Sequence, residues 1–566
     1  MPTTPAPSLV LGVFDGTHDA GAALVRGGRL VAACNEERFS RKKGQGGWPA
    51  ASIAACLEVA GVAAEQLEAV AFAGLVNPNP GLRLARGLQR RWRLDEGSFF
   101  RAEPSPGARL DEWLQFDSPF PRLRSDGQAA RSFAPLLRAR LRAQLRPVFG
   151  ARADHLAIHL HDHHRCHAAA AWHSAGEAEG LVLIADGLGD GLALSVWRGR
   201  GAELIPLDAW PFPDSYGLLY ATITGFLGFR PFRHEGKLTG LAAAGDPGAI
   251  PLPFPFEGPP QRRRFTQQFG ARLRPWLERL RPYRPEDVSA WLQLHIEQEL
   301  RGLLSYWMDR TSLKRVALGG GLFANVRLNQ RLAELPGLER LWVFPHMGDG
   351  GLGIGAAWLS AGEPSRERLP NVFLGPSWGR AALLAALQGA GLSVEEPADL
   401  PAELARRLAR GQIIGSFEGA IELGPRALGN RSILAAAGAE MPARLNRALS
   451  RSDFMPFAPI LLAEDADDWV EGLDPVRDSA AFMTVALQAR PELQRRCPAI
   501  VHLDGSLRPQ LVDRVQRPFL HATLTAYREL TGRPALINTS FNMHEEPIVG
   551  GPEEAVRTFV EAGLDG

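Results

Sequence analysis

The sequence predicts an α/β protein of two domains, the first of which is internally duplicated. Three observations support this: a repeated strand-turn-strand motif, helical patterns that alternate with strands, and a Gly- and Pro-containing break at NVFLGPSWG (371–379). Domains typically have about 100 to 200 residues, so a chain of 566 residues is long enough for at least two of them. We expect the first domain at 1–370 and the second at 371–566.

The repeat predicts the fold of the first domain. The segments LVLGVFDGTHDAGAALVRGGRLV (9–31) and LVLIADGLGDGLALSVWRGRGAELI (181–205) align well. Each contains an apolar strand, an Asp-Gly-x-x-Asp turn that begins at Asp15 or Asp186, an alternating strand, a Gly-containing turn and a further strand. One copy alone would be an ordinary β-hairpin. Two copies predict a duplicated fold with hairpins facing across a cleft, the layout of actin and hexokinase-like ATPases, in which such turns approach nucleotide phosphates.

The alternation of helices and strands continues beyond the repeat. A helical pattern at 51–60 precedes an apolar strand at 69–73. Between Pro78 and Pro147 regular strands are scarce, and LRLARGLQRRWRL (82–94) has the pattern of a basic helix. We interpret it as the solvated face of a lid-like insertion rather than as a nucleic-acid contact.

Charge and cysteine content exclude several classes of protein. The 63 Lys and Arg residues nearly balance 62 Asp and Glu residues, which leaves a formal charge of +1 and no broad field for nucleic acid or an anionic membrane. The four cysteines form no CxxC pair, which fits a reducing compartment. The N-terminus lacks a basic signal-peptide region, and no apolar run approaches the roughly 18 residues of a membrane span. We therefore expect a cytoplasmic protein without membrane or nucleic-acid partners.

A histidine-rich segment predicts a metal site. HDHHRCHAAAAWH (161–173) contains His163 and His167, which lie on one face if the segment is helical. Asp349, in FPHMGDGGLGIGAA, follows a predicted strand at 341–344 and precedes a Gly/Ala-rich helix, where it can supply a third ligand. Mixed nitrogen and oxygen ligation suits zinc, iron or manganese. The alternative is a group of core or helix-capping histidines.

Two Gly-rich segments are candidates for a nucleotide site. VALGGGLFANVRLN (316–329) places Gly319, Gly320 and Gly321 between a strand and a helix, where backbone N–H groups can reach a phosphate. FRHEGKLTGLAAAG (232–245) predicts a Gly-rich loop that carries Lys237 and Glu235. We assign Lys237 and Asp186 to the nucleotide site, with a surface ion pair as the alternative for Lys237.

The second domain contains four segments rich in Arg, Asn, Gly and Pro. They are EGAIELGPRALGNRSIL (418–434), LNRALSRSDFMPFAPILL (445–462), DGSLRPQLV (504–512) and LINTSFNMHEEPIV (536–549). Guanidinium groups match phosphate oxygens in pairs, and the surrounding Gly, Pro and Asn residues indicate tight backbone turns. We predict a phosphate-binding set rather than solvated surface arginines, consisting of Arg426, Arg431, Arg451, Arg508, Ser540 and Asn542.

The order of the motifs resembles that of one enzyme family over nearly the whole chain. GTHDAGAA, NEERFSRKK, DHHRCHAAAA, ADGLGDG, EGKLTGLAAAG, GGGLFANV, GDGGLGIGAA, ELGPRALGNRSIL, MPFAPI and NTSFNMHEEPIV occur in the order of the NodU/CmcH family of O-carbamoyltransferases, which includes enzymes of antibiotic biosynthesis. The resemblance implies a first domain similar to the metal-containing tRNA threonylcarbamoyl-transferase, on an actin-like fold. It implies a second domain similar to YrdC.

The resemblance also implies an activity and residue roles. The second domain would convert carbamoyl phosphate and ATP with Mg²⁺ into carbamoyl-adenylate, and the first would transfer the carbamoyl group to a hydroxyl of a small-molecule acceptor. His163, His167 and Asp349 would bind a divalent metal, and His18 would be the general base. The other implied roles are carbamoyl phosphate binding by Arg426, Arg451, Arg508, Ser540 and Asn542, and lining of the adenylate site by Gly319, Gly320 and Asn325. A homodimer is an open alternative to a monomer.

Two other functions remain alternatives. A small-molecule kinase of the actin-like class would use the same Asp-Gly turns, but it needs neither the histidine pair nor a second domain. A regulatory protein that binds metal and nucleotide without turnover would use the arginines as an effector site.

Overall fold

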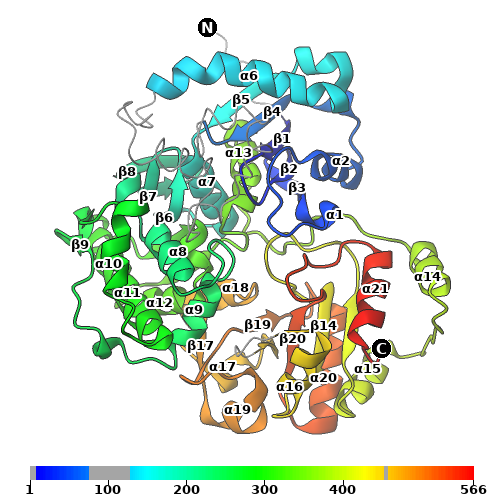
Figure 1. Ribbon diagram of the computed structural model, residues 1–566. Coiled ribbons are helices and arrows are strands. Elements are labelled where there is room, and N and C mark those ends of the chain that lie inside the picture. Colours follow the sequence, from blue (N-terminus) through cyan, green and yellow to red (C-terminus); the bar gives the residue numbers. More distant parts are fainter. Residues whose placement is uncertain (1–7, 76–127, 452–456) are drawn as a thin grey trace. The chain divides into compact units, whose positions relative to one another are not determined.

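The computed structural model describes residues 8–75, 128–451 and 457–566 (Figure 1). The basic helix predicted at 82–94 lies outside these residues. The chain divides into a first unit of residues 1–36 and 45–368 and a second unit of residues 37–44 and 369–566. The main division thus falls two residues before the boundary that we predicted. The segment 37–44 belongs to the second unit although it precedes most of the first unit in the sequence.

The first unit contains two five-stranded sheets with the same topology. In each, three antiparallel strands come from one copy of the repeat. A later strand pairs in parallel with the first of the three, and a second later strand pairs in parallel with that one. The predicted duplication is therefore confirmed. The first sheet has the order β3 (Arg29–Asn35), β2 (Gly21–Arg26), β1 (Leu9–Phe14), β4 (Ala69–Ala73), β5 (Ala157–His161). The second has the order β8 (Glu203–Pro211), β7 (Leu192–Arg200), β6 (Glu179–Gly189), β11 (Arg315–Gly319), β12 (Arg340–Val343).

Two helices join the halves of the first unit. Helix α13 (Leu352–Ser360) packs on β1, β2 and β4, helix α7 (His163–Ala175) packs on β6 and β11, and the two helices pack on each other. The close approach of α13 to α7 depends on Gly355, since a Cβ there would lie 1.9 Å from the carbonyl oxygen of Cys166. The close approach of β1 to α13 depends on Gly12, since a Cβ there would lie 1.8 Å from the carbonyl oxygen of Gly353. The N-terminal ends of these helices thereby meet where the two halves join.

The remaining helices of the first unit surround the sheets (Figure 1). The predicted helix at 51–60 is confirmed as α2. The prediction of a Gly-rich loop around Lys237 is wrong, because Glu235 and Lys237 lie on α9, where buried Leu238 and Gly240 pack toward α11 and override the low helix propensity of glycine. The helices around the two sheets are α2 (Ala50–Val59), α6 (Gln128–Phe149), α8 (Tyr216–Phe226), α9 (Glu235–Ala242), α10 (Arg274–Glu278), α11 (Pro285–Thr311) and α12 (Val326–Ala333). No helix of the described residues has the length and apolar character needed to cross a membrane.

The second unit is also α/β. Its main sheet has the order β13 (Ile414–Phe417), β14 (Arg431–Ala436), β20 (Ala535–Ser540), β15 (Ala458–Leu462), β19 (Gln510–Val512), and a small sheet contains β16 (Val470–Glu471), β17 (Leu487–Ala489) and β18 (Ser506–Leu507). Helices α15 (Leu400–Ala409) and α20 (Pro518–Thr531) pack on each other, and α20 contacts β15 and β20. Also present are α1 (Glu37–Ser40), α14 (Arg380–Gly389), α16 (Met441–Ala448) and α21 (Pro552–Ala562).

Candidate active site

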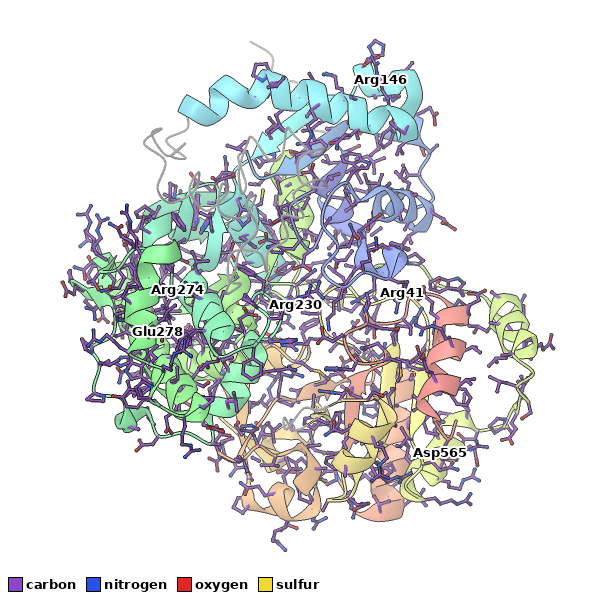
Figure 2. All side chains as sticks on the ribbon, viewed as in Figure 1. Arg41, Arg146, Arg230, Arg274, Glu278 and Asp565 are labelled. Atoms are coloured by element: carbon purple, nitrogen blue, oxygen red, sulfur yellow. The ribbon has the colours of Figure 1, made fainter. Side chains whose placement is uncertain are left out.

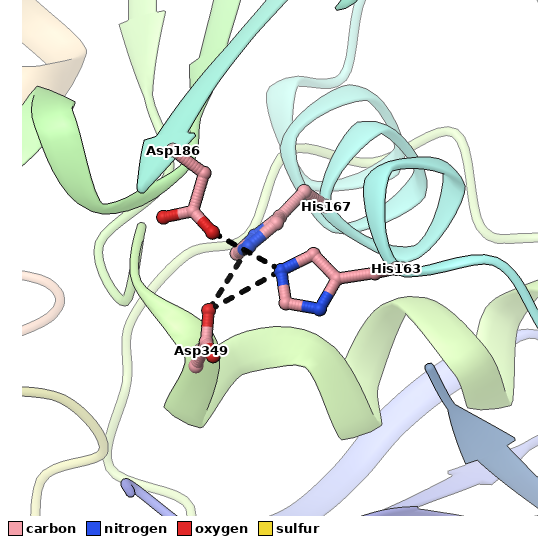
Figure 3. Close-up of side chains that lie close together, drawn as sticks. All are labelled: His163, His167, Asp186 and Asp349. Carbon is pink, nitrogen blue, oxygen red and sulfur yellow. Dashed lines mark hydrogen bonds and ion pairs between the residues drawn. The ribbon is translucent and has the colours of Figure 1, made fainter. Parts of the chain in front are cut away.

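Four buried side chains meet between the halves of the first unit (Figure 3). His163 and His167 lie one turn apart on α7, and Asp349 begins the short turn that leads into α13. Asp186, on β6, completes the group, and one ligand atom from each of the four lies within 4.8 Å of the others. The sequence placed the first three at a metal site but assigned Asp186 to the nucleotide, so its place in this cluster was missed.

The geometry of the cluster fits a divalent metal. His163 Nε2 lies 3.2 Å from Asp186 Oδ2 and 3.4 Å from Asp349 Oδ1. His167 Nε2 also lies 3.4 Å from Asp349 Oδ1, and no hydrogen-bond partner for this buried nitrogen is found in the part of the chain that the structure describes. Two imidazole nitrogens and two carboxylates thus converge on one point, which is a donor set suited to zinc, iron or manganese.

Neighbouring residues fix the first of these histidines. The backbone N–H of His163 donates to Asp190 Oδ2 at 2.8 Å, and Asp190 also accepts the N–H of Leu75 at 2.8 Å. A Cβ on Gly189 would lie 2.1 Å from the imidazole ring of His163, so only glycine leaves room for this ring. The loop around Asp349 is held by Asn35, which donates to the carbonyl oxygen of Gly350 at 3.3 Å.

The charged groups of the cluster shift the pKa values of its members. Burial opposes the charged form of His163, but the carboxylates of Asp349 and Asp186 outweigh burial and raise the pKa of His163 well above its ordinary value. Burial and the neighbouring Asp349 both oppose ionisation of Asp186, yet its hydrogen bond with His163 and the charge of His167 lower the pKa of Asp186 to about 2. The pKa of Asp349 is lowered well below its usual range, mainly by His163, against the effect of burial. The two carboxylates therefore favour the protonated form of His163.

Zinc binding should displace that proton. Because the pKa of His163 is raised above its ordinary value, we expect release of about one proton for each Zn²⁺ bound near neutral pH. The affinity should therefore rise with pH until His163 is deprotonated in the metal-free protein. Titration calorimetry in buffers of different ionisation enthalpy measures the number of protons. Zinc binding without proton release would contradict the assignment of His163.

His18 lies beside the cluster and is accessible to solvent. Its Nε2 is 3.6 Å from Asp349 Oδ2, its side chain is 28% exposed, and its ring stacks on Phe232 with centroids 6.1 Å apart. His18 Nδ1 lies 3.1 Å from Asp19 Oδ2. Burial opposes ionisation of Asp19, but the hydrogen bond and charge of His18 outweigh it and lower the pKa of Asp19. When Nδ1–H donates to Asp19, Nε2 is left to accept a proton.

The predicted glycine turn also lies at this site. The N–H of Gly321 donates to Asp186 Oδ1 at 3.0 Å, and Gly320 has φ +100, a conformation that favours glycine. Asn325 caps α12, because its Oδ1 accepts the N–H of Leu328 at 3.0 Å and its Nδ2 donates to Gln293 at 2.7 Å. The structure thus connects the glycine turn to Asp186, whereas it gives the side chain of Asn325 a role in holding α12. Lys237 is partly exposed on α9.

Three of the four predicted arginines gather in the second unit. Burial, and then the charges of Arg426 and Arg451, lower the pKa of Arg508 well below its usual value, so the three guanidinium groups interact. Burial lowers the pKa of Arg426 to about 10, and its buried Nε has no hydrogen-bond partner within residues 8–75, 128–451 and 457–566. Arg451 donates to Thr539 Oγ1 at 3.3 Å, next to Ser540 at the end of β20. Among the described residues, no carboxylate offsets the shifts of Arg426 or Arg508, so this arginine cluster (Arg426, Arg451, Arg508) has the charge of an anion site.

Arg431 and Asn542 have a different environment from the one predicted. Arg431 is fully buried, donates to the carbonyl oxygens of residues 418, 419, 430 and 550, and lies over the ring of Phe417 at 3.7 Å. Backbone carbonyls therefore engage its donors, which gives Arg431 a part in holding the fold, and its role in phosphate binding stays a prediction. Asn542 Nδ2 donates to the carbonyl oxygens of Met543 and Glu546, so its amide closes its own loop.

Glu422, which the sequence did not single out, organises the loop that carries Arg426. Its buried Oε1 accepts the backbone N–H groups of Leu428, Asn430 and Arg431 at 3.1, 2.8 and 2.9 Å. Glu422 is itself paired with Phe373 in an isolated β-bridge and precedes a Gly- and Pro-rich turn. A carboxylate at such a place can accept the N–H groups of the turn, but the sequence alone does not say which ones.

Loss of this carboxylate should destabilise the second unit. Glu422→Ala leaves three backbone donors unpaired, and we expect the free energy of unfolding to fall by about 3 kcal/mol. Glu422→Gln should cost less, because an amide oxygen can replace Oε1 and Oε2 has no hydrogen-bond partner among the described residues. Chemical denaturation monitored by circular dichroism measures both values. Equal stability of the alanine variant and the wild type would contradict this role.

Comparisons with known proteins agree with the resemblance read from the motifs. Residues 133–251 and 263–358 match the model of the carbamoyltransferase N-terminus, and residues 405–566 match that of the carbamoyltransferase C-terminus. The nodulation protein NolNO of Sinorhizobium fredii is 32% identical over 97% of this chain and 78% of its own length. The nodulation protein NolO of Bradyrhizobium diazoefficiens is 34% identical over 72% of this chain and 77% of its own.

The match to the solved structure of a protein named HypF is remote. HypF of T. kodakarensis matches with a TM-score of 0.35 and 12% identity over 65% of this chain and 49% of that one. The family models, by contrast, together match more than half of the chain, and they match parts of both units. The chain therefore belongs to the carbamoyltransferase family.

Proposed function

We propose that the protein is an ATP-dependent O-carbamoyltransferase that uses carbamoyl phosphate and passes through carbamoyl-adenylate. Its acceptor would be a hydroxyl group of a small molecule of the secondary-metabolite or antibiotic class. The arginine cluster is the observation that carries this proposal, since three interacting guanidinium groups whose pKa shifts no carboxylate of the described residues offsets suit a small phosphorylated donor. Membership of the carbamoyltransferase family supports the nature of the transferred group.

In the donor half-reaction, the arginines act on phosphate oxygens. Water cleaves carbamoyl phosphate to carbamate and phosphate, and a carbamate oxygen then attacks the α-phosphorus of ATP and displaces pyrophosphate. Arg426, Arg451 and Arg508 would hold the phosphate group of the donor and neutralise the charge that develops on its oxygens. The product is a mixed anhydride with AMP, in which AMP is a much better leaving group than the oxygen of free carbamate.

In the transfer half-reaction, His18 acts on the acceptor. Its Nε2 would take the proton of the acceptor hydroxyl as the oxygen attacks the carbamoyl carbon and AMP leaves, while Asp19 accepts Nδ1–H and stabilises the imidazolium that forms. The residues that would hold the metal are His163, His167, Asp186 and Asp349, adjacent to His18. A bound divalent ion would supply positive charge for a carbonyl or phosphate oxygen at this step.

One experiment separates this function from its alternatives. The protein is incubated with ATP, carbamoyl phosphate, Mg²⁺ and zinc, and the products are identified. Pyrophosphate release that depends on carbamoyl phosphate supports the transferase, ADP would indicate a kinase, and no turnover would indicate a regulator. Adding an extract of small molecules and searching for compounds that gain one carbamoyl mass then identifies the acceptor.

His18→Ala should separate the two half-reactions. Loss of a general base typically lowers a rate by about 10²- to 10⁴-fold, so carbamoyl transfer to the acceptor should fall by that factor. Pyrophosphate release should persist, because the arginine cluster is unchanged. Parallel assays of pyrophosphate and of the carbamoylated product measure both steps, and loss of both steps would contradict the role of His18.

A further inference from the structure

The segment Glu37–Gly44 belongs to the second unit and contacts two of its loops. Arg38 is only 3% exposed, and its Nη2 donates to the carbonyl oxygen of Gly424 at 2.7 Å while its Nη1 donates to Glu37 Oε1 at 2.6 Å. Glu37 Oε2 accepts the N–H of Gly44 at 2.8 Å, which closes the segment on itself. Arg41, labelled in Figure 2, donates to the carbonyl oxygens of Pro547 and Ile548, both at 2.7 Å.

Arg38 contacts the backbone of the loop that carries Arg426, a member of the arginine cluster. Gly424 precedes Arg426 by two residues and has φ +100, a conformation in which any other residue would be strained. Glu422 anchors the other side of the same loop through the N–H groups of residues 428, 430 and 431. Arg426 thus lies on a short loop that is fixed by Arg38 on one side and by Glu422 on the other.

Arg426 needs such support. Its charge and those of Arg451 and Arg508 have the same sign, so in the absence of an anion they repel each other. Among the described residues its buried Nε has no hydrogen-bond partner. The backbone that carries Arg426 therefore contributes to the position of its guanidinium group.

We propose that Arg38 is a positioning residue for Arg426, and that the affinity of the second unit for the phosphate group of its donor depends on Arg38. The inference rests on the proposed function. The planar guanidinium group of Arg38 donates from Nη2 to the carbonyl oxygen of Gly424 and from Nη1 to the carboxylate of Glu37. The single ammonium group of a lysine cannot make both bonds with this geometry. Residues from the N-terminal part of the chain thereby help to build a site whose anion-binding side chains come from residues 426–508.

Inorganic phosphate is the probe for this inference, because its binding does not require turnover. Titration calorimetry on the full chain should show phosphate binding by the wild type and its loss in Arg426→Ala. Arg38→Ala should weaken phosphate binding by about tenfold or more, which is the usual effect of losing a hydrogen bond to a charged group. The KM for carbamoyl phosphate should rise by a similar factor with little change in the KM for ATP.

Two features distinguish positioning from general stability. Added guanidinium ion should restore phosphate binding to Arg38→Ala by occupying the vacated site. The matched control is Arg496→Ala, because Arg496 likewise joins a glycine carbonyl, that of Gly532, to a glutamate, Glu492. This variant should bind phosphate as the wild type does and should not respond to guanidinium.

The outcomes separate this inference from the proposed function. If Arg426→Ala loses phosphate binding while Arg38→Ala keeps the wild-type affinity, the inference is wrong and the proposed function stands. If the wild type binds no phosphate, or Arg426→Ala binds it equally well, the proposed function itself is wrong. Where circular dichroism shows that Arg38→Ala is unfolded, Arg38→Lys replaces it: weaker phosphate binding by this folded variant supports the inference, and unchanged binding overturns it.

Discussion

His167→Ala should abolish high-affinity zinc binding and, with it, carbamoyl transfer. Among the described residues His167 Nε2 has no hydrogen-bond partner, and it lies 3.4 Å from Asp349 Oδ1, so removing the imidazole deletes one of the four candidate metal donors together with its ion pair with Asp349. Loss of residues that merely support a metal site already costs about 10- to 100-fold in affinity, and loss of a ligand should cost at least the upper value. Calorimetric zinc titration and the carbamoyl-transfer assay measure the two effects.

The matched control is His173→Ala. His173 is a second buried histidine of α7, but it packs against Trp358 with ring centroids 6.0 Å apart and is not part of the cluster. Burial lowers the pKa of His173 to about 4, so this residue is neutral near pH 7 and its loss removes no charge. The control should lose stability and keep the zinc affinity of the wild type. Equal loss of zinc binding in both variants would mean that α7 was merely disturbed and that the cluster is not the metal site.

The features that were correctly predicted depend on local sequence. Each copy of the repeat forms adjacent antiparallel strands joined by short turns, so the hairpins of both sheets can be predicted from about 25 residues of sequence. The spacing of His163 and His167 is likewise a property of one helix. The segment 37–44 is the opposite case, because its membership of the second unit depends on contacts such as that of Arg38 with Gly424, 386 residues away in the sequence.

The surroundings of two residues of the candidate site could not be predicted for the same reason. Asp186 stands in a turn that suits either a phosphate or a metal, and only its distance from His163 and Asp349 across the fold favours the metal. Arg426 and Arg431 lie in one motif, yet the first belongs to the arginine cluster and the second is buried between backbone carbonyls and Phe417. Residue type and spacing identified the motif, whereas the direction of each side chain depends on strand pairing that the sequence does not reveal.

Arg508→Met should suppress pyrophosphate release dependent on carbamoyl phosphate while leaving the protein at least as stable as the wild type. Burial and two like charges lower the pKa of Arg508, which means that its positive charge is unfavourable in the ligand-free fold. Methionine keeps much of the aliphatic volume and removes the repulsion, so the free energy of unfolding should rise by about 1 kcal/mol. Donor turnover should fall by about 100-fold or more, as expected when a charge-neutralising group is lost from a site.

The combination of lower activity and undiminished stability separates a ligand-binding arginine from a structural one. Loss of a structural arginine such as Arg431, which donates to four backbone carbonyls, would destabilise the fold. Arg514→Met is the control, because Arg514 is exposed and follows Arg508 by six residues, and it should change neither property. Phosphate should raise the melting temperature of the wild type and of Arg514→Met but not of Arg508→Met. Destabilisation of Arg508→Met in the absence of phosphate would instead assign Arg508 to the fold.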